Sequence, residues 1–116
     1  MIALPRFSDQ AVTYLEDFDR RSADQNDTPV ALRLQSRMWM GPDEDEIRYT
    51  APHLRVYGRA GTHGSATITD PVNVPVGNSS FLMSRSDVER IGSASIDLLR
   101  VHSASGDAFN YVLTIS

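Results

Sequence analysis

The 116-residue chain contains no cysteine and no lysine, and it has a single tryptophan. Without cysteine the protein can form no disulfide, no thiolate metal site and no thiol nucleophile. We therefore expect its stability to come from packing, from bound ions or from association with other subunits. The length suits one domain, because domain sizes peak at about 100–150 residues.

Long apolar runs are also missing. No stretch approaches the roughly 20 apolar residues that cross a bilayer. The first residues, MIALPRFSD, do not show the charged start and apolar stretch of a signal peptide. We therefore expect no membrane partner and a cytoplasmic location, unless an assembly carries the protein elsewhere.

The charges are unusual in kind rather than in number. All eleven cationic side chains are arginine, and the formal net charge is −4. Codon bias in a GC-rich genome accounts for this; the alternative is that arginine serves bidentate, planar pairing at an interface. The arginines are scattered singly, without the basic cluster of a nucleic-acid binder. The sequence thus disfavours a nucleic-acid partner.

An amphipathic pattern predicts one helix over residues 8–21. Its apolar stripe recurs at the i, i+4, i+7 and i+11 positions, which are Ala11, Leu15, Phe18 and Ser22. Ser8 suits the N-cap, and cations close the segment. A competing strand over residues 12–18 would turn Glu16 toward the core, which is unfavourable for a carboxylate.

Short alternating segments follow, separated by turn residues. They predict seven or eight strands, at 30–40, 47–50, 54–57, 66–69, 72–76, 80–83, 94–101 and 108–115. In the last of these Phe109, Tyr111, Leu113 and Ile115 share a face. The spacing of Ser86 and Glu89 matches a capping box, and Gly92 is a plausible stop, so a short helical turn is expected there.

These patterns predict a mainly β fold: a single-domain antiparallel β-sandwich or small barrel with one N-terminal amphipathic helix. We divide the chain into an N-terminal arm at residues 1–7, the helix at 8–21 and the sandwich at 30–116. The segments at 22–29 and 58–66 are expected to be loops.

The strand at 30–40 suggests a contact surface. Its outward phase carries Arg33, Arg37 and Trp39, and Arg55 and Tyr57 have the same phase on the strand at 54–57. Tryptophan and arginine most often dominate protein interfaces, so we interpret these five residues as a partner contact. On this hypothesis Trp39→Ala weakens assembly and leaves the fold intact. The alternative is that the helix covers this face as a second core layer.

No catalytic, cofactor or metal site is predicted, and we expect a non-enzymatic protein. The acidic run Asp43–Glu46 offers oxygen ligands for Ca²⁺, but a solvated turn explains it better. The three imidazoles, on His53, His63 and His102, lack the spacing of a helical metal motif. A group of hydrolase residue types surrounds a predicted hairpin turn without a nucleophile elbow: His102, Ser103, Ser105 and Asp107.

From Val74 the chain reads VPVGNSSFLMSRSDVERIGSASIDLLRVHSASGDAFNYVLTIS. This pattern resembles the small immunoglobulin-like β-sandwich modules of tailed-phage virions, and it covers the last third of the chain. The positions that carry it are Ser86, Asp87, Ile91, Gly92, Asp97, Leu98, Gly106 and Leu113. The front departs from the pattern, because such modules usually begin with a strand and this chain begins with a helix.

The resemblance implies a non-enzymatic virion component, such as a capsid cement (decoration) protein or a tail or baseplate adaptor, assembled in the host cytoplasm. It transfers no functional residue. The implied partners are other protein subunits, including further copies of the chain. Two alternatives stay open: a small phage- or host-encoded inhibitor that occludes a partner's surface, and a metal- or sugar-binding sandwich that uses the histidines or the acidic run.

Overall fold

The computed structural model describes residues 2–22, 29–36, 38–40, 47–49, 51–59, 68–103, 105–106 and 109–116. Within these ranges the chain is mainly β, as predicted, with nine strands and two helices. In chain order the elements are β1 (Arg6–Phe7), α1 (Asp9–Arg21), β2 (Val30–Gln35), β3 (Met38–Met40), β4 (Ile47–Tyr49), β5 (His53–Arg59), β6 (Pro71–Val76), β7 (Ser79–Ser84), α2 (Arg85–Ile91), β8 (Ser95–His102) and β9 (Phe109–Ile115).

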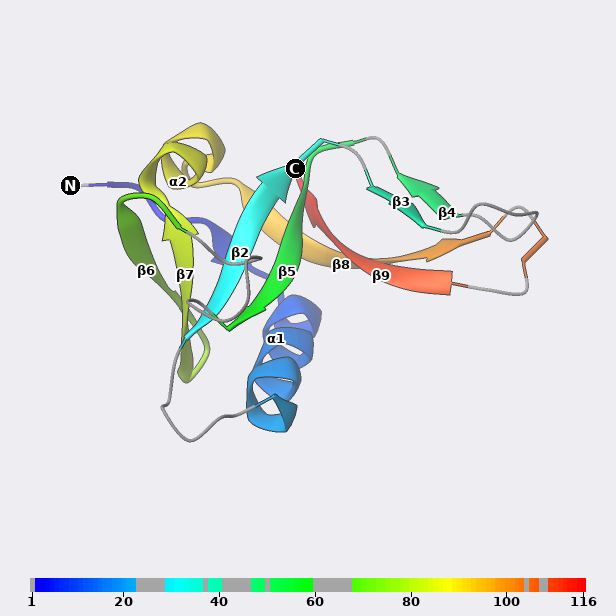
Figure 1. Ribbon diagram of the computed structural model, residues 1–116, viewed down its shortest axis with the longest axis horizontal. Helices are drawn as coiled ribbons and strands as arrows, with labels where there is room; N and C mark the ends of the chain where they lie inside the picture. The colour runs from blue at the N-terminus through cyan, green and yellow to red at the C-terminus, as the bar shows by residue number, and fades with distance from the viewer. Residues whose placement is uncertain are drawn as a thin grey trace.

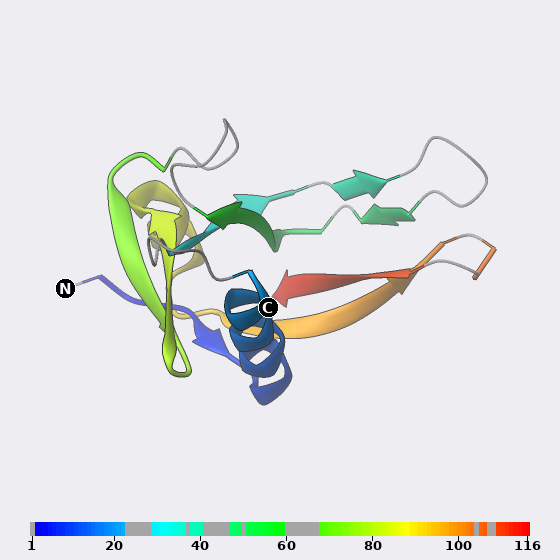
Figure 2. The ribbon, with the colours of Figure 1, turned by 60° about the horizontal axis from the view of Figure 1, so that its bottom comes forward.

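Seven strands form one sheet in the order β1-β8-β9-β5-β2-β7-β6, and β3 and β4 form a separate two-stranded ribbon. The sheet curls until it is nearly closed, which is consistent with a small barrel or sandwich (Figure 1). Helix α1 lies across its lower side, and α2 lies beside β6 and β7 (Figure 1). Figure 2 shows the β3–β4 ribbon and the β8–β9 hairpin extending in the same direction, away from α1.

Two of the strand pairings are parallel, so the prediction of a wholly antiparallel sheet is wrong. Strand β1 pairs with β8 in parallel, with Arg6 opposite Ser95, and β2 pairs with β7 in parallel, with Val30 opposite Phe81. Strand direction depends on how distant segments return to the sheet, and alternation within one strand carries no information about it. Arg6 and Phe7, which the sequence placed in an N-terminal arm, form the edge strand β1.

The predicted helix is confirmed as α1. The side-chain oxygen of Ser8 accepts a hydrogen bond from the backbone N–H of Ala11 at 3.2 Å and so caps the helix. Ala11 and Leu15 are fully buried, and Phe18 and Ser22 are half-buried. The apolar stripe therefore faces the core, as the spacing predicts.

The core lies between α1, α2 and the curled sheet. Its largest fully buried side chains come from both halves of the chain: Leu15, Val30, Leu32, Val74, Val76, Phe81, Met83, Val88 and Ile96. Burial of a side chain of this size contributes about 1.5–3 kcal/mol, so the cluster supplies the main favourable term in folding.

The short helix α2 begins earlier than the capping-box match predicts. Its N-cap is Ser84 rather than Ser86, because β7 runs directly into the helix and Ser84 is the last residue of that strand. The carboxylate of Asp87 instead accepts a hydrogen bond from the backbone N–H of Leu34 at 3.2 Å. Gly92 ends the helix with φ of +61°, as expected for a stop residue.

The strand predicted at 30–40 is two strands in different sheets. β2 ends at Gln35, where it pairs with β5, and β3 begins at Met38, where it pairs with β4. A register shift between Ala31 and Leu32 buries three consecutive β2 residues, which simple alternation does not allow. Ile68 and Thr69 are outside any strand; the first half of the strand predicted at 66–69 lies outside the described residues.

Candidate functional site

Three of the five predicted contact residues meet on the ladder between β2 and β5. Arg33 and Arg55 are register partners, and their guanidinium carbons lie 5.2 Å and 5.1 Å from the centre of the Tyr57 ring. The side-chain amide of Gln35 donates a hydrogen bond to the Tyr57 hydroxyl and fixes the ring. Cations directly opposite one another are unfavourable in a sheet, and the shared aromatic ring offsets part of that repulsion. We call these four residues the arginine–tyrosine cluster.

The remaining two residues do not extend this cluster along one strand. Trp39 lies in β3, opposite Arg48, in the separate ribbon. Its side-chain environment and the whole of Arg37 lie outside the described residues. Residues 30–40 do not form the one continuous strand on which that prediction rests, because β2 ends at Gln35 and β3 begins at Met38.

A second surface, which the sequence patterns did not predict, lies on the β8–β9 hairpin. Phe109 and Tyr111 are 45% and 42% exposed. The Tyr111 ring lies 5.8 Å from that of Tyr14 and 5.6 Å from that of Phe109, with centroids as reference points. The His102 ring lies 6.1 Å from Phe109, and the Arg100 guanidinium carbon lies 3.7 Å from the centre of that ring. We call these five residues the aromatic strip.

The register of the hairpin explains why these side chains share a face. Arg100 pairs with Tyr111 and His102 pairs with Phe109, so the four side chains project to one side of the ladder. Helix α1 covers the same face nearer the start of β8, where Ile96 is fully buried. The hairpin continues beyond the helix (Figure 1), and its outer half is left uncovered by the described residues.

The sequence predicted which β9 side chains share a face, but not which of them are exposed. The shared face of Phe109, Tyr111, Leu113 and Ile115 was predicted, and the register confirms it. Leu113 is buried and Ile115 half-buried, whereas the two aromatic residues are exposed. The extent to which α1 covers the sheet depends on tertiary packing, and the alternation within one strand carries no information about it.

A groove of about 710 Å³ separates α1 from the hairpin and adjoins the aromatic strip. Its lining combines two aromatic rings with polar groups: Asp9, Gln10, Thr13, Tyr14, Asp17, Arg21, Leu98 and Tyr111. Arg20 and Arg21 both pair with Asp17, the latter at 2.9 Å from Nε to Oδ2. Partial burial is the main cause that raises the pKa of the Tyr14 phenol above its ordinary value; the Arg21 charge acts in the opposite direction, and Tyr111 also raises the pKa. Tyr14 is therefore a neutral hydroxyl at physiological pH.

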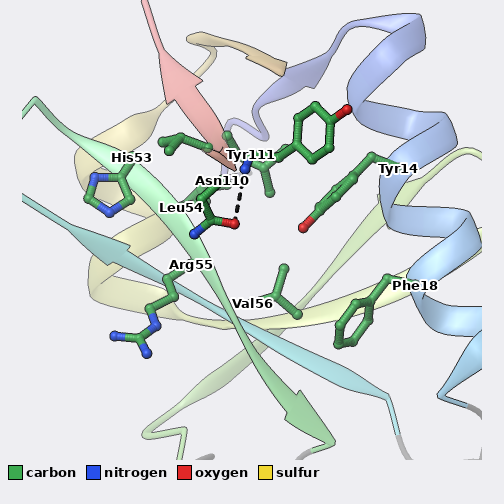
Figure 3. A pocket seen from close by; sticks show the side chains of 10 residues that line it. Tyr14, Phe18, His53, Leu54, Arg55, Val56, Asn110 and Tyr111 are labelled. Atoms are coloured by element: carbon green, nitrogen blue, oxygen red, sulfur yellow. Dashed lines mark hydrogen bonds between the residues drawn. The ribbon is translucent and has the colours of Figure 1, made fainter. Parts of the chain in front are cut away.

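A further cleft, of about 280 Å³, opens between β5 and β9 (Figure 3). Two side chains of α1, Tyr14 and Phe18, lie on one side of it, and Arg55 lies on the other (Figure 3). Most of the described residues that line the cleft are apolar or aromatic, and His53, Arg55 and Asn110 are the polar ones among them.

Two of the three histidines lie in described parts of the chain. His53 is 1% exposed, with its Nδ1 lying 2.9 Å from the carbonyl oxygen of Ala51. His102 belongs to the aromatic strip, and His63 lies outside the described residues, as does the acidic run at 43–46. In the described ranges no three His, Cys, Asp or Glu side chains gather as a metal site would require.

The serines near His102 belong to a turn. The hydroxyl oxygens of Ser103 and Ser105 are 3.1 Å apart, and the N–H of Gly106 donates to the carbonyl of Ser103 at 3.0 Å. His102 packs on Phe109 instead of approaching a hydroxyl in any contact that the structure shows. Asp107 lies outside the described residues.

Comparison of the chain with known protein families, with characterised proteins and with solved structures finds no match. Among the described residues, neither helix has the length and apolar character needed to cross a membrane.

Proposed function

We propose that the chain is a non-enzymatic protein that acts by contacting other protein subunits, as a structural component of a phage particle such as a cement protein or a tail or baseplate adaptor. The observation that carries the proposal is the aromatic strip. Aromatic residues and arginine are enriched at the centre of protein interfaces, where they supply most of the binding energy. Here Phe109 and Tyr111 are nearly half exposed beside Arg100.

The shape of the hairpin supports the same function. The protein measures 43 × 32 × 25 Å along its principal axes, and β8 and β9 extend along the longest of them (Figure 1). An aromatic face on an extended arm reaches a neighbouring subunit without displacing the core. The particle setting follows from the resemblance of the last third of the chain, which includes this hairpin.

Photo-cross-linking during particle assembly tests the proposal. A photoreactive phenylalanine analogue at position 109 is compared with the same analogue at position 89, because Glu89 is exposed on α2, away from the strip. We expect the protein in purified particles at a fixed ratio, with a covalent adduct to a particle subunit from position 109 and none from position 89.

Two outcomes contradict the proposal in different ways. Particles that lack the protein rule out a structural component. An adduct to one soluble host protein, at a ratio of one to one, would favour the alternative of an occluding inhibitor that uses the same strip.

A further inference from the structure

Strands β5 and β9 pair over only a short stretch, although each has seven residues. Their ladder consists of His53 opposite Thr114 and Leu54 opposite Leu113. In the described part of the chain, the two strands have no pairing with each other beyond this point. The cleft of about 280 Å³ adjoins this ladder, because His53, Leu54 and Leu113 also line it.

The lining shows that the cleft lies between the two strand backbones. It is formed by the consecutive residues 53–56 of β5 and 110–113 of β9. Successive side chains of a strand point to opposite faces of a sheet, and the lining includes neighbouring residues such as Arg55 and Val56. The cleft is therefore an opening between the two strands, with Tyr14 and Phe18 of α1 on one side of it.

The hydrogen bonds between β8 and β9 determine which backbone N–H and C=O groups of β9 point toward β5. Ser95 and Ser116 exchange both of their backbone hydrogen bonds, at 3.1 Å and 3.0 Å, so even-numbered β9 residues bond to β8 and odd-numbered ones face β5. Leu113 is one of these odd-numbered residues, and it pairs with Leu54 of β5. Two residues further along, the N–H of Tyr111 donates at 3.0 Å to the side-chain oxygen of Asn110 (Figure 3). The Asn110 side chain thus accepts the hydrogen bond from the Tyr111 N–H, which would otherwise be available to a neighbouring strand.

The two sides of the opening differ in chemistry. Tyr14, Phe18 and Val56 present aromatic and aliphatic surface on the α1 side (Figure 3). Arg55 lies on the opposite side, is exposed, and stacks on Tyr57. No ion pair of Arg55 is found with any described carboxylate.

We propose that the opening between β5 and β9 accepts an extended segment of a partner protein as an additional strand, and that this segment alternates apolar and acidic side chains. Unpaired strand edges bind extended peptides through main-chain hydrogen bonds, and the flanking surfaces select the side chains. Because side chains of the added strand alternate, its apolar residues would meet Tyr14, Phe18 and Val56. Its carboxylates would meet Arg55, where the planar guanidinium forms paired hydrogen bonds.

Selection from a library of random decapeptides against the full chain tests the proposal. We expect the enriched peptides to alternate apolar and acidic residues, and the backbone amide of Val56 to exchange at least 10-fold more slowly with solvent when the best peptide is bound. Methylating alternate amides of that peptide removes main-chain donors and should weaken binding at least 10-fold.

Charge variants provide the matched control. Arg55→Glu should weaken binding at least 10-fold, whereas Arg90→Glu, the same change at an exposed position of α2, should leave it unchanged. The strip variant Phe109→Ser should also leave peptide binding unchanged, because Phe109 does not line the cleft. This readout separates the inference from the proposed function of the aromatic strip.

Three results would overturn the inference: no enrichment of any peptide, enriched peptides that bind Arg55→Glu as tightly as the unaltered chain, or protection of amides elsewhere with none at Val56. Each is observed with folded protein, since Arg55 is exposed and its replacement removes only its contact with the Tyr57 ring.

Discussion

The N–H of Asn78 donates a hydrogen bond to the Oε2 atom of Glu16 at 2.8 Å. This bond ties the middle of α1 to the tight turn between β6 and β7, two segments 62 positions apart. The turn comes so close to the helix that a side chain at position 77 would have to displace the Glu16 and Val12 side chains. A Cβ atom there would lie 2.6 Å from the same Glu16 oxygen and 2.8 Å from Val12 Cγ1, and the φ of +59° is itself unfavourable for other residues.

Gly77→Ala should therefore lower the free energy of unfolding by about 2–5 kcal/mol, as backbone strain of about 1–2 kcal/mol adds to overpacking of about 1–3 kcal/mol. Urea denaturation followed by circular dichroism measures the loss. Gly106→Ala is the matched control, because φ is +81° there and no atom of the described residues lies within 4 Å of the added Cβ, so strain is the expected cost. Equal losses in the two variants would show that the approach of α1 contributes nothing.

Asp87 and Leu34 form a second long-range link. The parallel pairing of β2 with β7 covers only Val30 and Ala31, and beyond it the Asp87 carboxylate accepts the Leu34 N–H at 3.2 Å. Asp87→Ala leaves this half-buried donor without its acceptor, which costs about 1–3 kcal/mol.

Thermal and urea denaturation of three variants test this link. Asp87→Asn retains an acceptor oxygen and should lose less stability than Asp87→Ala. Glu89→Ala, on the exposed side of the same helix, should change stability by less than about 0.5 kcal/mol. If Asp87→Ala behaves like Glu89→Ala, the bond to Leu34 does not stabilise the fold.

The sequence was sufficient where one element determines its own structure. Spacing alone identified α1, with Ser8 as its cap, and alternation placed Phe109, Tyr111, Leu113 and Ile115 on one face of β9. Gly92 was identified as a helix stop for the same local reason.

It was insufficient where distant segments decide the outcome. The parallel partners of β1 and β2 and the separation of β3 from β2 depend on contacts that no local period encodes. The candidate site follows this division. Arg33, Arg55 and Tyr57 meet because alternation places them on one face of two paired strands. The aromatic strip, in contrast, depends on where α1 stops covering the sheet.

A pH-dependent contribution to stability is expected at Asp97. Its Oδ1 accepts hydrogen bonds from the Ser8 hydroxyl at 2.7 Å and from the Leu98 N–H at 2.8 Å, and these bonds, the Ser8 one foremost, lower the pKa of the carboxyl below 3.8. A lowered folded-state pKa means that the carboxylate stabilises the fold above the ordinary pKa. This contribution is lost as the pH falls through the lowered value.

Urea denaturation of the unaltered chain and of Asp97→Asn between pH 7 and pH 2 measures it. We expect the difference in unfolding free energy to be constant at neutral pH and to shrink below pH 3.8, where the carboxyl becomes protonated. A difference that stays the same down to pH 2 would show that ionisation of Asp97 has no role in this contact.

The aromatic strip should contribute little to folding, although its residues are large. Phe109 is 45% exposed, whereas Phe81 is fully buried between the sheet and the helices. Phe81→Ala should cost about 3–5 kcal/mol through lost burial and the cavity it leaves. Phe109→Ser should cost less than about 1 kcal/mol, since its partners Arg100, His102 and Tyr111 form only surface contacts with it. Denaturation of both variants decides the matter, because an equally large loss for Phe109→Ser would make the strip part of the core and leave it no surface with which to bind a partner.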